Sequence, residues 1–287
     1  MAPQPTRRSA AVAGTWYPGH PATLASAIDH YFGQVGETIA GEITALVSPH
    51  AGLMYSGPVA AHAYRQLEGR AYDVVVLVGP SHHMGFEGVA IVARGVFETP
   101  LGDVEVSADD ADTIIASCPA VLELPAAHRR EHSLEMQLPF LQRALPGVPI
   151  VPLVMGHQSR ATINALAEGL SSAMASRRAL LVASSDLSHY QTSSRAALLD
   201  RVIVDAIERF DPEAVERALV RDPGHACGGG PIVAVMRAAR ALGAADARVV
   251  CYADSGAVSG DTGAPNVPNS AVVGYCAALF GTFGAPA

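Results

Sequence analysis

Histidines follow three separate apolar runs in this 287-residue chain. His50 comes after the first run, the pair His82-His83 after the second, and His189 after the third. In an open α/β sheet, ligands bind outside the carboxyl ends of the strands, where side chains from different strands converge. Imidazole is a common ligand of divalent metals. The spacing therefore predicts a metal site with His50 and His82 as ligands and His83 beside the bound substrate.

A histidine after a strand, taken alone, is more often a hydrogen-bonded boundary residue than a ligand. Two of these sites share more than that position. Pro49 and Pro80 each fix the backbone just before the histidines, and Gly79 permits a close approach of other chain segments. This shared arrangement favours a common role for His50 and His82.

Asp186 and His189 lie three residues apart in a predicted strand-to-helix turn. A carboxylate in that position can orient an imidazole, which then transfers protons or binds metal. Asp186 is also a suitable helix N-cap, and the two interpretations are compatible. We predict catalytic roles for both residues.

A polar cluster from Arg129 to Glu135 opens an apolar helical segment. Capping by Ser133 and an acidic start at Glu131 explain part of it without chemistry. The functional interpretation makes His132 a catalytic residue and places Glu135 in contact with substrate.

Cys227 precedes three glycines and a proline, an order that resembles an anion cradle before a helix. The Lys-Ser/Thr pair of a P-loop is missing, so the tight turn more simply brings Cys227 to the substrate. Asp261 lies in a predicted loop over residues 254–269. It is either a turn residue or a third metal ligand.

Other functional classes are disfavoured. The sequence contains no G-x-S-x-G elbow, no H-E-x-x-H motif and no C-x-x-C pair. A net charge of −8 with only 19 basic residues argues against a nucleic-acid partner. No apolar run approaches the roughly 20 residues of a membrane-spanning helix. Because residues 1–18 also lack the apolar core of a signal peptide, we expect a cytoplasmic protein.

The elements that must position these residues alternate along the chain. Runs rich in Val, Ile and Leu predict strands at residues 43–48, 74–79, 89–93, 150–154, 179–183, 247–253 and 271–279. Helical spacing predicts helices at residues 21–32, 58–66, 108–117, 134–144, 161–175, 194–209, 211–220 and 231–242. This alternation predicts one α/β domain over residues 1–287, a sandwich whose mixed or mostly parallel sheet is flanked by helices.

Seven stretches together resemble the Memo family, also called AmmeMemoRadiSam system protein B. They follow the order of the family from near the N-terminus to the last strand: Ala13 to Pro18, Ser48 to Gly57, Gly79 to His83, Thr99 to Gly102, Glu131 to Met136, Ser184 to His189, and Cys227-Gly228. The resemblance implies the fold of class III extradiol dioxygenase catalytic subunits, which bind ferrous iron at strand ends.

Residue by residue, the resemblance implies that His50 and His82 bind the metal and that His189 is the acid/base residue. Animal members have a cysteine in the loop after the penultimate strand, where this chain has Val258. We therefore expect Asp261, three residues on, to complete a His, His, carboxylate set, which suits Fe(II) with open coordination positions. Copper or zinc would also suit the imidazoles.

We thus predict a non-haem Fe(II)-dependent oxidoreductase of the dioxygenase type. Its small-molecule or peptide substrate would contact Trp16 and Tyr55, two aromatic side chains near the predicted site. The alternative is a non-catalytic metal-binding or peptide-binding protein. The resemblance implies AMMECR-like and radical SAM proteins as partners in either case.

Overall fold

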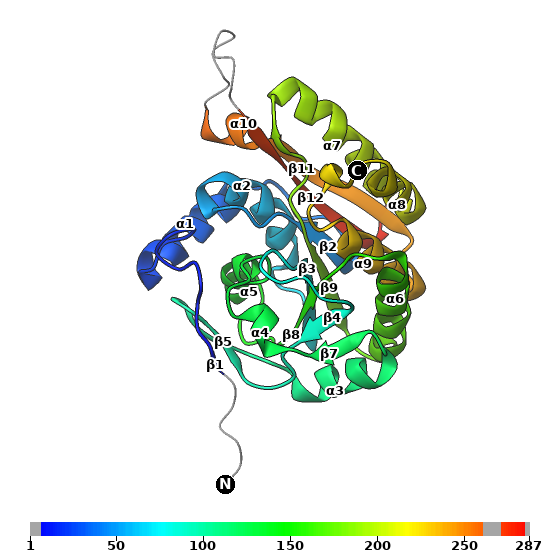
Figure 1. Cartoon of the computed structure of the whole chain (residues 1–287). Coiled ribbons are helices and arrows are strands. Elements are labelled where there is room, and N and C mark those ends of the chain that lie inside the picture. The colour runs from blue at the N-terminus through cyan, green and yellow to red at the C-terminus, as the bar shows by residue number, and fades with distance from the viewer. Residues whose placement is uncertain (1–6, 261–270, 285–287) are drawn as a thin grey trace.

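A mixed β-sheet forms the centre of the molecule (Figure 1). The computed structural model describes residues 7–260 and 271–284. The strands of the sheet run in the order β10-β12-β2-β9-β3-β8-β4-β7, and β11 pairs with β12. Their bounds are β2 Gly41–Ser48, β3 Val74–Pro80, β4 Val89–Ile91, β7 Val121–Glu123, β8 Ile150–Met155, β9 Ala179–Ser184, β10 His189–Gln191, β11 Asp246–Asp254 and β12 Val272–Phe283.

The middle of the sheet is parallel. β2, β9, β3 and β8 run in the same direction, whereas β12 is antiparallel to β2 and β4 is antiparallel to β8. The carboxyl ends of β2, β9 and β3 consequently meet at one edge. The predicted α/β fold with a mixed sheet is confirmed.

Helices cover both faces of the sheet. One face is covered by α3 Ala108–Ser117, α6 Arg160–Met174, α7 Ser193–Glu208, α8 Pro212–Arg221 and α9 Gly229–Ala241. The other is covered by α1 Pro21–Gly33, α2 Leu53–Tyr64, α4 Pro125–His128 and α5 Leu138–Ala144 with the 3-10 turn Glu135–Gln137. Figure 1 shows α1, α2 and α5 on one side and α6, α8 and α9 on the other.

The central strands are apolar on both faces because each face packs against helices. In β3, Val74, Val76 and Val78 belong to one hydrophobic cluster, and Val75 and Leu77 belong to the other. This period of two follows from strand geometry, in which successive side chains point to opposite faces. The near-continuous apolar runs in the sequence arise from this two-sided burial.

Helix α2 begins earlier than predicted. Pro58, which we placed in the first turn, lies inside a helix that starts at Leu53. The amide of Leu53 donates to the carbonyl of Trp16 at 2.8 Å, so a distant segment satisfies a helix-start donor. The prediction was wrong because this tertiary bond leaves no local sequence signal.

A second, three-stranded sheet holds the N-terminal segment. β1 (Arg7–Arg8) pairs in parallel with β5 (Val96–Thr99), which is antiparallel to β6 (Gly102–Glu105). The short α10 (Ser255–Ser259) follows β11, with the Asp254 side chain capping it. Within residues 7–260 and 271–284, no helix has the length and apolar character needed to cross a membrane.

His128 is a buried, neutral histidine of the core. It is 1 % exposed, and its Nε2 donates to the carbonyl of Ala90 at 3.1 Å. Its Nδ1 is buried and has no hydrogen-bond partner among the described residues. Burial lowers the pKa of His128 to about 4. In the unfolded chain this histidine has a pKa of about 6.5, so the unfolded state binds a proton at a higher pH than the folded state does.

We expect His128 to destabilise the metal-free protein between about pH 6.5 and pH 4, by up to about 3 kcal/mol. The variant His128→Gln, whose amide nitrogen can take the place of Nε2, keeps a donor for Ala90 but does not titrate. Denaturant unfolding with a chelator present, at several pH values in this range, should show a shallower loss of unfolding free energy in the variant. Equal slopes would contradict the assignment.

Candidate metal centre

Three histidines meet at the carboxyl edge of the central strands. His50 follows β2, His82 follows β3, and His132 comes from the segment between α4 and α5. Their ligand atoms lie within 4.8 Å of one another. The ring centroids of His50 and His82 are 5.2 Å apart, and those of His82 and His132 are 4.5 Å apart. Nitrogens bound to one metal at about 2.1 Å are at most about 4.2 Å apart, so small movements suffice for coordination.

Gly79 explains how His132 reaches this edge. A Cβ atom at Gly79 would lie 2.7 Å from Oγ of Ser133 and 2.8 Å from the side chain of Leu134. The missing side chain lets this segment lie directly on the end of β3, where Ser133 Oγ donates to the carbonyl of Pro80 at 3.0 Å. His132 consequently stacks on His82.

Hydrogen bonds to Ser184 determine the tautomer of His50. The Ser184 hydroxyl donates its proton to the carbonyl of Ser133 at 2.6 Å and accepts from Nε2 of Gln137 at 2.8 Å. His50 Nδ1, 2.8 Å from the same oxygen, must therefore be the donor in that contact. Nε2 of His50 is left with a free lone pair toward the cluster.

Glu131 orients His82. Its carboxylate accepts from Nδ1 of His82 at 2.8 Å and from the backbone amides of His82, His132 and Ser133. A carboxylate on the far nitrogen is the usual support of a metal-binding imidazole. Glu131 is 2 % exposed. Burial raises its pKa, but the bonds from His82 and Ser133 outweigh burial and hold the pKa well below its ordinary value.

The surroundings of His50 and His132 favour the neutral form of these two imidazoles. Burial, and next the neighbouring His82 and His132, lower the pKa of His50 well below its ordinary value. Burial and His82 lower the pKa of His132 to about 4. A histidine binds metal through an unprotonated nitrogen, so His50 and His132 are ready to bind near neutral pH.

Cys227 adds a thiol to this group. Its Sγ lies 3.2 Å from Nε2 of His50, the nitrogen with the free lone pair. Burial, and next the charge of Asp186, raise the thiol pKa to about 12. Gly228 is required beside it, because a Cβ there would lie 2.4 Å from the carbonyl of Ser184. Cys227, which we placed against the substrate, is thus a candidate ligand.

Asp186 contacts His50 in place of His189. Its Oδ1 accepts from the amide of His50 at 2.7 Å, and burial raises its pKa to about 7 against the effect of the His50 and Ala51 amides. Within the described residues, no hydrogen bond joins Asp186 to His189. The His189 side chain bonds instead to the backbone of Leu187, and burial lowers its pKa. The predicted orienting role of Asp186 toward His189 was therefore wrong.

The residues that we predicted to contact substrate differ in their position relative to the histidine cluster. Trp16 lies on His132 with ring centroids 4.3 Å apart, and His83 lies 6.0 Å from the same ring. Tyr55 is 40 % exposed and lies near Gly52, close to His50 in the chain. Glu135, unlike these side chains, is bonded to the N-terminal segment.

Both oxygens of Glu135 are bonded within the chain, to Arg8, to the amides of Ala11 and Val12, and to the hydroxyl of Tyr17. Glu135 is fully buried and supports the N-terminal segment instead of facing the histidine cluster. Asp261, our predicted third ligand, lies outside the described residues.

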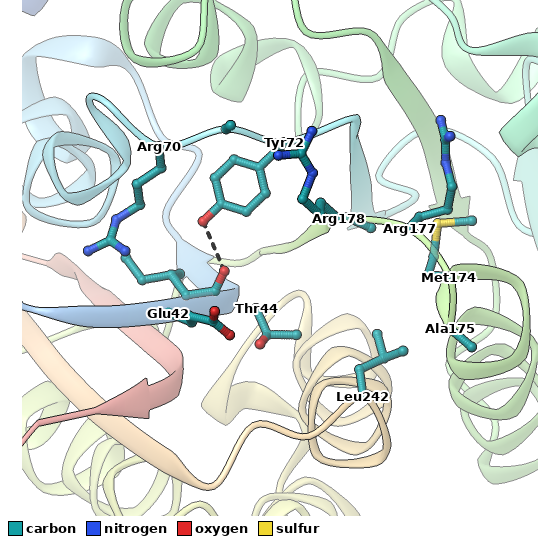
Figure 2. Close-up of a pocket in the computed structure, with 12 residues that line it drawn as sticks. Glu42, Thr44, Arg70, Tyr72, Met174, Ala175, Arg177, Arg178 and Leu242 are labelled. Atoms are coloured by element: carbon teal, nitrogen blue, oxygen red, sulfur yellow. Dashed lines mark hydrogen bonds between the residues drawn. The ribbon is translucent and has the colours of Figure 1, made fainter.

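A separate hollow opens at the opposite end of the parallel strands. Figure 2 shows it between the beginnings of β2, β3 and β9, with Tyr72 bonded to the carbonyl of Ile43. Its volume is about 300 Å³. Its three arginines all have partners in the chain: Arg70 bonds to backbone carbonyls, Arg177 to Asp110, and Arg178 to Asp73. The convergent ligand atoms lie at the histidine edge, so we assign the functional site there.

Comparison with known proteins identifies the family of the chain and supports its fold. The family model described as "Memo-like protein" matches residues 8–279. The chain belongs to the Memo family. A MEMO1 family protein of Methanosarcina mazei is 39% identical over 277 residues, covering 95% of this chain and 98% of the relative. A MEMO1 family protein of Methanopyrus kandleri is 35% identical over 285 residues, with the same coverage of both chains.

The crystal structure of the uncharacterized protein JW3007 from Escherichia coli K12 has a similar fold. Its TM-score is 0.55 and its sequence identity is 14%, covering 84% of this chain and 100% of that one. At this identity the similarity concerns the fold alone. It supports the α/β architecture independently of the sequence relatives.

Several residues around the histidine cluster were not assigned from the sequence. Glu131 was interpreted only as a helix-start residue, and Ser184 and Gln137 received no individual role. Ser133 Oγ, our proposed cap, bonds to Pro80 instead of to a helix amide. A Glu-His pair ahead of an apolar helix was the available signal for Glu131.

We expect Glu131→Gln to weaken metal binding by about 10- to 100-fold, because the amide cannot accept all four donors and no longer fixes Nδ1 of His82. Glu216→Gln is a matched control, since Glu216 is 7 % exposed and bonds to Arg160 and Arg237 on another helix layer. Titration of the metal-free protein with Co(II), followed by absorbance, measures the affinity. Equal affinities for wild type and Glu131→Gln would contradict the role of Glu131.

Proposed function

We propose that this chain is a non-haem Fe(II)-dependent oxidoreductase of the dioxygenase type. The observation that carries the proposal is the group of three clustered imidazoles, of which His50 is buried. Two of them, His50 and His82, present Nε2 to one point. His132 or Cys227 supplies the third ligand. Bound Fe(II) would supply adjacent open positions for O₂ and an organic substrate.

The residues of the chain perform the remaining tasks. Ser184 and Glu131 hold the imidazoles of His50 and His82 in their ligand tautomers. Trp16 excludes water from one side of His132 and offers an aromatic wall to the substrate. His189, which bonds through its ring to Leu187, keeps a second ring nitrogen to exchange a proton with a substrate hydroxyl.

Copper and zinc fit the same donors, and affinity alone favours copper over iron. We expect protein purified without oxygen to contain about one iron per chain, and His50→Ala and His82→Ala to lose most of it. His30→Ala, on the exposed side of α1, serves as the control. Elemental analysis of the anaerobically purified proteins measures their iron content. Undiminished iron in both site variants would refute the metal site.

Turnover is tested separately. We expect O₂ consumption with one member of a panel of catechols and related small molecules, and a fall of at least about 100-fold in His189→Gln with iron content unchanged. An oxygen electrode measures the rate. Stoichiometric iron without O₂ consumption across the panel would refute the oxidoreductase.

A non-catalytic binding function is the second candidate. Four large apolar side chains are exposed on segments next to the predicted site residues. Trp16, 39 % exposed, lies on His132, and Met54 (66 %) and Tyr55 (40 %) are in the helix that follows His50. Tyr190, 78 % exposed, lies beside His189. Exposed apolar surface around a site is typical of protein or peptide binding. Under this candidate, AMMECR-like and radical SAM proteins are the partners to test, by co-purification with the metal-loaded chain.

A further inference from the structure

Glu135 is a fully buried carboxylate with donors on both oxygens. Oε2 pairs with the guanidinium of Arg8 and accepts from the amide of Ala11 at 2.8 Å. Oε1 accepts from the amide of Val12 at 3.0 Å and from the hydroxyl of Tyr17. All four donors belong to residues 8–17. One side chain therefore docks this whole segment, which we call the N-terminal strap.

Arg8 ties the strap to the segment that carries His132. Its Nε donates to the carbonyl of His128 at 3.0 Å, and its NH2 donates to the carbonyl of Glu131. Arg8 is only 6 % exposed, and the carboxylate of Glu135 compensates its buried charge. The strap and the metal-binding segment are thus joined through a buried ion pair.

Between these anchors the strap folds into a tight turn that presents Trp16. The amide of Trp16 donates to the carbonyl of Val12 at 2.9 Å, and Gly14 has φ +78°, a conformation that favours glycine. The carbonyl of Trp16 accepts from the amide of Leu53 at 2.8 Å, three residues after His50. The backbone of Trp16 is therefore fixed on both sides.

The Trp16 side chain is not held by burial in the core. It is 39 % exposed, yet its ring lies 4.3 Å from the ring of His132. Since a half-exposed indole has many alternative rotamers, its position over the cluster depends on how the strap is docked. We infer that Glu135 is a positioning residue, which docks the strap and so holds Trp16 as one wall of the metal centre.

The inference concerns access to the site. Its consequence for ligand binding rests on the proposed metal function, and the docking of the strap does not. A docked strap limits which ligands reach His132 from this side. An undocked strap exposes His132 to water and to bulkier ligands. Glu135 itself touches neither the histidines nor a ligand.

Trp16 is the only tryptophan in the chain, so its fluorescence reports the strap directly. In Glu135→Gln we expect the acrylamide quenching constant to rise at least about twofold and the emission to shift to the red. Saturating Co(II) should quench the wild-type emission, and this quenching should fall by at least half in the variant. Co(II) stoichiometry, measured by absorbance, should stay the same. Unchanged acrylamide quenching and unchanged Co(II) quenching would overturn the inference.

Asp110→Asn is the matched control. Asp110 is 4 % exposed, pairs with Arg177 and lies in α3 on the other face of the sheet. We expect it to leave the Trp16 signals unchanged, and an equal change in this variant would overturn the inference as general loosening. Should Glu135→Gln fail to fold, Tyr17→Phe removes one donor and should raise the acrylamide constant by a smaller factor. No rise in Tyr17→Phe would then overturn it.

The two proposals fail in different ways. If the wild type binds no Co(II), the metal proposal fails, while acrylamide quenching still tests the strap. If Co(II) binds, and both acrylamide and Co(II) quench equally in the two proteins, the metal site stands and the strap inference fails.

Discussion

A buried carboxylate needs donors, and Glu131 obtains them from two segments that lie 49 residues apart in the chain. It accepts from the ring and the amide of His82, at the end of β3, and from the amides of His132 and Ser133. The same four bonds orient one imidazole and bring a second next to it. Loss of this carboxylate would leave several buried donors unpaired, so the geometry of the centre depends on it.

The fold supplies the place for this interaction. Because β2, β9 and β3 are parallel neighbours, the residues after them emerge at the same edge. β9 contributes Ser184, whose hydroxyl oxygen accepts a hydrogen bond from Nδ1 of His50 and thereby directs Nε2 toward the cluster. The histidines that follow β2 and β3, on either side of β9, thus use two different acceptors, a hydroxyl and a carboxylate, for the same purpose. Both histidines present the same nitrogen to the centre.

Seven strands of the central sheet, most helices and two of the clustered histidines were predictable, because they depend on local periodicity and on where apolar runs end. The short strands β1, β5, β6, β7 and β10 were not predicted. His132 as a third member was not, since its position depends on the missing side chain of Gly79. The contact of Cys227 with His50 was not predicted for a similar reason. Its thiol reaches His50 only because Gly228 packs against Ser184, a contact between residues 44 apart in sequence. Val258, which by resemblance stands where animal members have a cysteine, lies in α10.

The Cys227 thiol gives the metal-free site a stable arrangement of its own. With His50 Nδ1 donating to Ser184, the Sγ proton is the one available for Nε2, which satisfies a buried nitrogen without any ion. Burial also keeps the thiol protonated. Metal binding at Nε2 would displace this hydrogen bond, and a divalent cation would favour the thiolate that burial disfavours. The same contact can therefore serve two states, a hydrogen bond in the empty site and a pair of ligands in the filled one.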